Sequence, residues 1–246
     1  DDALRHGDRI YARIAGCGMS SDGETGSMTI PSPLGQRRAL QRAFASSGFR
    51  PGTVGYVEAH GTGTPIGDAV ELEELGEAFA EASPHSIPVG TVKAHIGHLK
   101  SAAGMASMIK VVEALQNRTI PPAWIEGDIR DEFNQPTFPF ALAPEARPWP
   151  RMGTVPRRAA VSAFGFGGSN YHLHLEEFDE RQRELSSSRL LLFSGANEDG
   201  VRARVSAFSA AVGERGAVDV ASVEQIAQLG GRGDCRLAVV WDGESS

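Results

Sequence analysis

The chain has 246 residues, of which 41% are hydrophobic and 22% charged, and it carries a formal net charge of −7 at pH 7. This acidic balance excludes a general role in binding nucleic acid or an anionic membrane surface, because both need a basic patch. No apolar run approaches the roughly 20 residues of a membrane span, and the opening residues, DDALRHGDRI, hold no signal-peptide core. The two cysteines, Cys17 and Cys235, lie far apart, so we expect a protein of the reducing cytoplasm.

Strand-like and helix-like runs alternate through most of the chain. In order, we expect a strand at Ile10–Ala15, a helix at Gly35–Ser47, a strand at Val54–Val57, a helix from about Asp68 to Ala82, a strand at Ile87–Val92, a helix at Leu99–Asn117, and strands at Arg158–Ala163 and Tyr171–Leu175. Small residues at the start of the last helix allow close approach to another backbone, as in the centre of a layered domain. The alternation predicts an α/β fold.

The chain is expected to have three parts. Residues 1–178 hold the alternating elements, and residues 179–189 are charged and serine-rich, which is typical of a linker. Residues 190–246 then contain a strand, two helices and a strand, which predicts a small β-α-α-β subdomain. Because the chain opens on what resembles the end of a helix running into a strand, we expect it to be a fragment of a longer protein.

The stretch EAHGTGTPIGD, residues 58–68, places His60 between a strand and a helix. A dinucleotide-binding loop would need a third glycine where Ile66 stands, so close packing over a pyrophosphate is not specified. A metal site would have to unite His60 with His95 and His98, but the latter two flank a glycine turn instead of lining one helix face, and no cysteine is near in sequence. We expect neither a nucleotide nor a metal.

A second stretch, VGTVKAHIGHLKSAAG at residues 89–104, gives His98 the same strand-then-helix context. In a parallel sheet such strand ends meet at one edge, where active sites form. Two neutral imidazoles directed at one point can donate hydrogen bonds to a developing oxyanion. Lys93 is close enough in sequence to tune their pKa values. A single histidine here is more often structural, so it is the matched pair of His60 and His98 that favours catalysis.

Three motifs together resemble the β-ketoacyl synthase (ketosynthase) domains of polyketide and fatty-acid synthases. They are VEAHGTGTPIGD, VKAHIGHLKSAAG and SAFGFGGSNYHLHLEE, in the family's order, within roughly residues 1–178. The resemblance implies a thiolase-like fold, of which this chain would be the C-terminal half of a five-layer αβαβα architecture. Residues 190–246 are similar to the linker subdomain that follows a ketosynthase in modular synthases and leads to an acyltransferase.

The resemblance implies a decarboxylative Claisen condensation by a Cys–His–His triad. An acyl group on the cysteine is joined to a malonyl-type extender on acyl carrier protein, whose phosphopantetheine arm carries the substrate; no tightly bound cofactor and no metal is implied. The family's two histidines fall on His60 and His98 and its lysine on Lys93. The supporting residues that it implies are Thr62, Thr64, Asp68 and Asn170. Asp68 has an alternative role as the cap of its helix.

The glycine-rich stretch between the last two strands has a role of its own in the family. It forms a loop that borders the nucleophile and acts as a gate, and here it comprises Phe164, Gly165, Phe166, Gly167 and Gly168. Phe166 stands at the position of the gating side chain. The alternative is a tight strand connection packed by two phenylalanines.

Two departures from the family pattern bear on function. His95 replaces the asparagine that the family commonly carries, and neither Cys17 nor Cys235 has the context of a nucleophile. We therefore expect the reactive cysteine in an N-terminal half outside this chain, and the expected partners are that half, acyl carrier protein and a second copy in a homodimer. The alternatives are a thiolase-like enzyme using coenzyme A and a non-catalytic partner subunit of the chain-length-factor kind; retention of both histidines argues against the latter.

Overall fold

The computed structural model describes residues 2–23, 30–124, 126–178, 189–213 and 234–241. By internal contacts the chain divides into two compact units, Arg9–Phe178 and a second made of Asp1–Asp8 with Asp179–Ser246. Among the described residues, no helix combines the length and apolar character needed to cross a membrane.

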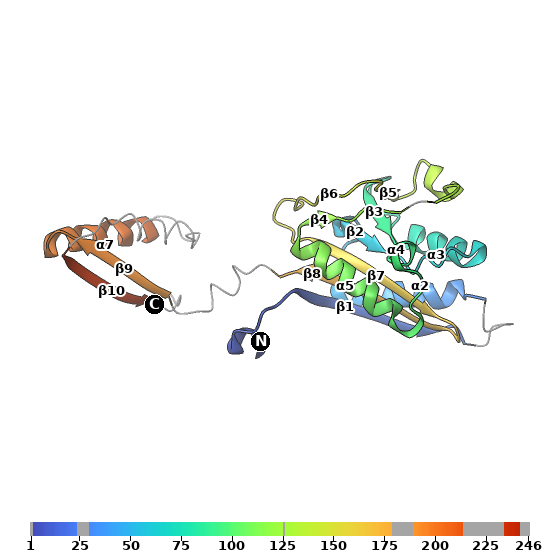
Figure 1. Ribbon diagram of the computed structural model, residues 1–246, viewed down its shortest axis with the longest axis horizontal. Helices are drawn as coiled ribbons and strands as arrows, with labels where there is room; N and C mark the ends of the chain where they lie inside the picture. The colour runs from blue at the N-terminus through green and yellow to red at the C-terminus, as the bar shows by residue number, and fades with distance from the viewer. Residues whose placement is uncertain (1, 24–29, 125, 179–188, 214–233, 242–246) are drawn as a thin grey trace. The chain divides into compact units, whose positions relative to one another are not determined.

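The larger unit is built on one six-stranded mixed sheet in the order β1-β8-β7-β2-β3-β5 (Figure 1). The strands are β1 (Ala12–Ser21), β2 (Tyr56–Glu58), β3 (Ile87–Gly90), β5 (Phe140–Leu142), β7 (Arg158–Gly165) and β8 (Ser169–Glu177). β7, β2, β3 and β5 run parallel, whereas β8 is antiparallel to both β7 and β1. The three central strands β7, β2 and β3 therefore end at the same edge, and each of the three sequence motifs leaves the sheet there.

Helices cover both faces of this sheet. They are α2 (Pro33–Ser47), α3 (Pro65–Ala78), α4 (Lys93–Ile96) and α5 (Ala103–Gln116), with single 3-10 turns at η1 (Pro51–Thr53), η2 (Lys100–Ala102) and η3 (Asp131–Asn134). Alternation along β2 shows the two sides: Val57 packs in a core cluster with residues of α2 and α3, and Tyr56 packs in a second cluster with residues of α5. Fully buried side chains such as Leu75 of α3 each stabilise the fold by about 1.5–3 kcal/mol.

Most expected elements are present with shifted ends. α3 begins at Pro65, three residues before the expected start, because proline suits the first turn of a helix, where its missing N–H is not needed. β1 extends to Ser21, well past the expected strand, since it pairs along its length with β8. The close approach inferred for the start of α5 is confirmed: a Cβ on Gly104 would lie 3.2 Å from the Cβ of Ala163 in β7. Not expected were α4, β5 and the short pair β4 (Thr119–Ile120) and β6 (Arg147–Pro148).

The smaller unit contains α1 (Asp2–His6), β9 (Arg189–Gly195), α7 (Glu198–Gly213) and β10 (Cys235–Trp241). β9 and β10 pair antiparallel, and Phe193 and Val201 are buried where α7 packs beside β9. Of the expected β-α-α-β elements, the structure describes both strands and the first helix, while the second helix, at residues 220–230, lies outside the described residues. The expected linker also lies outside them, apart from Arg189, which begins β9.

Candidate active site

His60 and His98 meet at the edge where β2 and β3 end. Their ring centroids are 5.6 Å apart and the ring planes stand at 86° to each other. The ring of Phe164, at the end of β7, lies 5.7 Å from that of His60. The parallel order β7-β2-β3 therefore brings the three sequence motifs together, as expected from the strand ends.

A buried carboxylate fixes the backbone that presents His60. Glu71 of α3 accepts hydrogen bonds from the backbone N–H groups of His60 at 2.6 Å and of Gly61 at 2.8 Å. Complete burial raises the pKa of Glu71 to about 7, although both N–H groups favour its ionised form. Gly61 has a positive φ of 43°, and a Cβ there would lie 2.9 Å from the Cβ of Thr91, so this turn requires glycine.

His60 is neutral near physiological pH. Burial, and then the positive charges of Lys93 and His98, lower its pKa to about 3. Its Nδ1 atom is buried and has no hydrogen-bond partner among the described residues. A neutral imidazole with a free nitrogen suits a proton donor or acceptor that acts only when substrate arrives.

His98 is exposed, and its tautomer is set by the backbone. Its Nδ1 accepts a hydrogen bond of 3.0 Å from the N–H of Lys100, so the neutral ring carries its proton on Nε2 and can donate it. Lys100 adopts a positive φ of 56°, which is strained for a side chain of that size. Desolvation, Lys93 and Lys100 lower the pKa of His98.

Lys93 is the first residue of α4 and is only 9% exposed. Its backbone N–H donates to Oγ1 of Thr91 at 3.3 Å. Burial lowers the pKa of its ammonium, while the negative charges of Glu71, Glu58 and Asp68 oppose that shift. Lys93, which the sequence analysis singled out, is thus a buried cation whose charge adds to the effect of burial in lowering the pKa of both imidazoles.

The polar residues of the HGTGT turn support its shape. The hydroxyls of Thr62 and Thr64 are 3.1 Å apart, and a carboxylate oxygen of Asp68 accepts from the N–H of Gly63 at 3.1 Å. The alternative role of Asp68 as helix cap is wrong, because Thr64 holds the cap position and Asp68 lies inside the first turn. Asp68 instead ties the helix back to the loop before it.

The glycine-rich loop is fastened by a residue that the sequence did not single out. The N–H of Asp22, after β1, donates to the carbonyl of Gly168 at 2.8 Å, and its carboxylate accepts from Nδ2 of Asn170 at 2.6 Å. Gly168 has a φ of 83°, and a Cβ there would lie 2.8 Å from the Cβ of Asp22. Phe164 is 9% exposed and Phe166 is 78% exposed, so the two phenylalanines do not pack alike.

The remaining candidates lie apart from the histidine pair. His95 is exposed, and its Nδ1 donates to the carbonyl of Thr91 at 3.4 Å. Within the described ranges, no group of three or more His, Cys, Asp or Glu residues is placed to hold a metal ion. Cys17 is exposed in the middle of β1, not at a strand end, and two strands separate β1 from β2.

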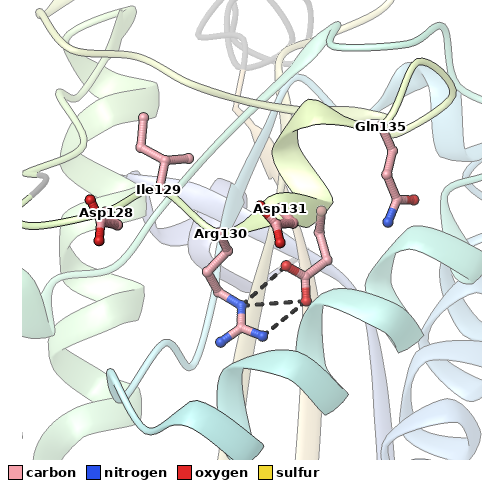
Figure 2. Close-up of a pocket in the computed structure, with 6 residues that line it drawn as sticks. Asp128, Ile129, Arg130, Asp131 and Gln135 are labelled. Atoms are coloured by element: carbon pink, nitrogen blue, oxygen red, sulfur yellow. Dashed lines mark hydrogen bonds and ion pairs between the residues drawn. The ribbon is translucent and has the colours of Figure 1, made fainter.

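A polar hollow of about 590 Å³ lies beside η3 and is lined by Asp128, Ile129, Arg130, Asp131, Glu132 and Gln135 (Figure 2). Arg130 binds the carboxylate of Glu132 through Nε and Nη2, and its Nη1 donates to the carbonyl of Pro65 at 3.2 Å. The guanidinium thus holds this loop to the start of α3.

Glu71 and Asp22 are the functional residues that sequence reasoning missed. Glu71 occupies a helix position flanked by apolar residues, where an acidic side chain is seldom buried without a partner, and that was the available signal. Asp22 had no such signal, because its partners come from the far end of the unit in sequence.

Two family profiles match the chain. The C-terminal domain of β-ketoacyl synthases matches residues 11–124, and the ketoacyl-synthetase C-terminal extension matches residues 138–233. One polyunsaturated fatty acid synthase chain of Thraustochytrium sp. is 40% identical over 237 residues, which are 88% of this chain and 8% of that protein. The highly reducing polyketide synthase alnA of Emericella nidulans is 41% identical over 177 residues, 71% of this chain and 7% of that protein.

A solved structure agrees with these profiles. The ketosynthase from module 6 of the bacillaene synthase of Bacillus subtilis 168 is 32% identical, with a TM-score of 0.69 over 98% of this chain and 44% of that chain. The chain therefore spans less than a tenth of these two curated relatives and less than half of the solved ketosynthase. Its mixed sheet matches the C-terminal half of a thiolase-like fold followed by the linker region.

Proposed function

The chain belongs to the β-ketoacyl synthase family, as the C-terminal domain with its extension, and we propose on that premise that it takes part in decarboxylative Claisen condensation. The reaction extends an enzyme-bound acyl group with a malonyl-type unit carried on acyl carrier protein, in polyketide or fatty-acid biosynthesis. The observation that carries the proposal is the pair of neutral imidazoles, His60 and His98, 5.6 Å apart at the edge of the sheet.

The chemistry asks for hydrogen-bond donors at one oxygen. When the bond between the malonyl carbon and its carboxylate breaks, carbon dioxide leaves and the electron pair passes into an enolate on the thioester. Nε2–H of His98 donates to that oxygen, and a neutral His60 beside it supplies a second donor. The enolate carbon then attacks the acyl thioester carbon, a carbon–carbon bond forms, and the cysteine thiolate leaves.

Lys93 has an electrostatic part in this proposal. Burial, and after it the charge of Lys93, lowers the pKa of both histidines, so both rings are neutral near pH 7. Because an imidazolium would attract the extender carboxylate and oppose its loss, neutral donors favour decarboxylation over simple binding of the anion. Glu71, Thr62, Thr64, Asp68, Asn170 and the loop Phe164–Gly168 are positioning residues in this scheme, with the exposed Phe166 as the moving gate.

We further propose that a separate N-terminal half supplies the nucleophilic cysteine. Four apolar side chains on α4, α5 and the turn between them are exposed; they are Ile96 (54%), Leu99 (43%), Met105 (56%) and Ile109 (56%). An apolar surface next to the two histidines is typical of an interface, and a half that covered it would bring its own residues to the site. A homodimer of such complete units is the assembly that we expect.

The test is decarboxylation of malonyl-acyl carrier protein by the chain together with its nucleophile-bearing half. His98→Ala and His60→Ala should each lower the release of carbon dioxide by a hundredfold or more, while transfer of an acyl group onto the cysteine persists. His85→Ala is the matched control, since His85 is exposed and contacts the Phe140 carbonyl away from the site.

Two outcomes would replace the proposal. Unchanged decarboxylation in both variants would make the chain a non-catalytic partner subunit. Equal turnover of coenzyme A and carrier-protein thioesters would favour a thiolase-like enzyme.

A further inference from the structure

A buried ion pair lies beneath the site. Glu58, the last residue of β2, is 0% exposed, and its carboxylate accepts from the hydroxyl of Tyr56 at 2.8 Å and from Nζ of Lys110 at 2.8 Å. Its other oxygen accepts from the backbone N–H of Val92. Every donor to this carboxylate therefore comes from a different part of the sheet edge: the strand itself, the turn before α4, and α5.

The Glu58–Lys110 ion pair and the Tyr56 hydroxyl lie in a space left by the missing side chain of Gly90. The ammonium of Lys110 lies 5.7 Å from the centroid of the Tyr56 ring, and the Lys110 side chain is only 14% exposed. A Cβ on Gly90, at the end of β3, would lie 2.8 Å from the Tyr56 hydroxyl and 3.5 Å from Lys110 Nζ. Any larger residue at Gly90 would therefore displace the Tyr56 hydroxyl, which is one of the donors to Glu58.

The position of the pair links it to both histidines. Glu58 lies two residues before His60, and Val92 directly precedes Lys93 at the start of α4. A carboxylate that holds the Val92 N–H thus fixes where the Lys93–His98 segment leaves β3, relative to the strand that presents His60. Loss of the cation would leave a fully buried charge without compensation, which the surroundings accommodate only by moving.

We propose that Glu58 and Lys110 are positioning residues that lock the His98 segment against the His60 strand and balance the charge around Lys93. The catalytic role of the two residues rests on the proposed condensation. Their effect on the charge around Lys93 does not, because that effect can be measured without turnover.

The charges that face Lys93 allow the charge-balancing role of Glu58 and Lys110 to be tested through the pKa of Lys93. Glu71 and Asp68 from α3 and Glu58 from β2 raise the pKa of Lys93, while Lys110 from α5 lowers it. His60 and His98 complete the set and are neutral near pH 7. Glu58→Gln and Lys110→Met break the same ion pair, yet the first removes a negative charge and the second a positive one. The two variants should therefore shift the pKa of Lys93 in opposite directions.

The experiment measures that shift by competitive labelling of amines with acetic anhydride across pH, read by mass spectrometry. The sequence favours it, because Lys93, Lys100 and Lys110 are the only lysines, and the exposed Lys100 serves as the internal reference. We expect Glu58→Gln to lower the pKa of Lys93 and Lys110→Met to raise it, each on the order of half a unit. The double variant and Lys110→Arg should both lie near wild type.

The control variant is Arg37→Met, which removes the cation of another buried glutamate, Glu74, with Arg37 Nε to Oε2 at 2.8 Å. It should leave the labelling of Lys93 unchanged. A shift of the Lys93 pKa in the same direction in both single variants would overturn the charge-balancing part of the proposal, since loosening alone exposes the amine and acts equally in both.

Turnover separates the two proposals. If Glu58 and Lys110 position the histidines, the single variants should lower kcat for decarboxylation by roughly tenfold to a hundredfold with little change in KM, as expected for misplaced catalytic groups. If the wild-type protein does not decarboxylate malonyl-acyl carrier protein, the proposed function fails while the opposite shifts of Lys93 still stand. Opposite shifts with unchanged kcat would overturn the positioning role alone.

Discussion

Glu71 provides the sharpest test of how the site is held, because its carboxylate is completely buried beneath the backbone of His60. Its folded-state pKa is about 7, against an ordinary value of 4.5. The native state therefore binds a proton that the unfolded state has already released between these two values. The contribution of Glu71 to stability is greatest at low pH and is lost as the pH rises through about 7.

Glu71→Gln removes this dependence. Glutamine is close in shape to the protonated acid, so the variant and wild type should differ least in charge at low pH and most at high pH. At 1.36 kcal/mol per pKa unit, the wild type should gain about 2 kcal/mol relative to the variant between pH 8.5 and pH 5.5. The hydrogen bond that the amide fails to make to His60 or Gly61 costs about 1–3 kcal/mol at every pH, so it cancels in the difference.

The assay is urea unfolding at the two pH values, followed by tryptophan fluorescence, with decarboxylation measured on the same samples. Activity should fall at both pH values, because the N–H groups of His60 and Gly61 lose their shared acceptor. Glu73→Gln removes the same charge from an exposed position of the same helix and should change neither the pH dependence nor the rate. A stability difference between Glu71→Gln and wild type that stays constant within about 0.5 kcal/mol from pH 5.5 to 8.5 would refute this account of Glu71.

Three further predictions follow from the same geometry. The decarboxylation rate should show no acidic limb between pH 6 and 8, since the pKa of His60 is about 3; a limb near pH 6.5 in the rate profile would contradict a neutral pair. Gly168→Ala should cost about 1–3 kcal/mol more in thermal unfolding than Gly153→Ala, because the positive φ is common to both positions but only a Cβ at Gly168 would clash with Asp22. Burial lowers the pKa of His174 to about 4, so the unfolded state takes up the proton first and the free energy of unfolding of the wild type should fall by about 2 kcal/mol from pH 7.5 to 4.5 on account of this residue. His174→Phe should abolish that fall, and an unchanged pH dependence in urea unfolding would exclude His174 as its source.

The parts of the site that sequence reasoning predicted are those encoded locally. His60 and His98 each stand between a strand and a helix, and parallel strands leave only one edge at which two such positions can meet. The glycine-rich loop could also be predicted, because a run of glycines between two strands permits few structures other than a tight connection. These inferences needed the order of elements and not their packing.

The missed features depend on contacts between distant segments. Asp22 reaches Asn170 across 148 positions of sequence, and Lys110 reaches Glu58 across 52; neither separation has a periodic signature. The alternative role of Asp68 as a helix cap was wrong for a related reason. An acidic residue at the start of a helix predicts a cap, but the helix begins three residues earlier, at Pro65. The carboxylate of Asp68 therefore lies in the first turn, where it accepts a hydrogen bond from the N–H of Gly63.

The two buried glutamates at this sheet edge, Glu58 and Glu71, are held by different kinds of partner. Glu58 is paired with a lysine, and its carboxylate accepts hydrogen bonds from three donors. Among the described residues, Glu71 accepts hydrogen bonds from two backbone N–H groups, and burial raises its pKa to about 7. A cation beside Glu71 would oppose that rise, and, like Lys93, it would also lower the pKa of His60. The carboxyl of Glu71 is buried because it holds the backbone N–H groups of His60 and Gly61, and the stability lost as the pH rises to about 7 is the consequence of that burial.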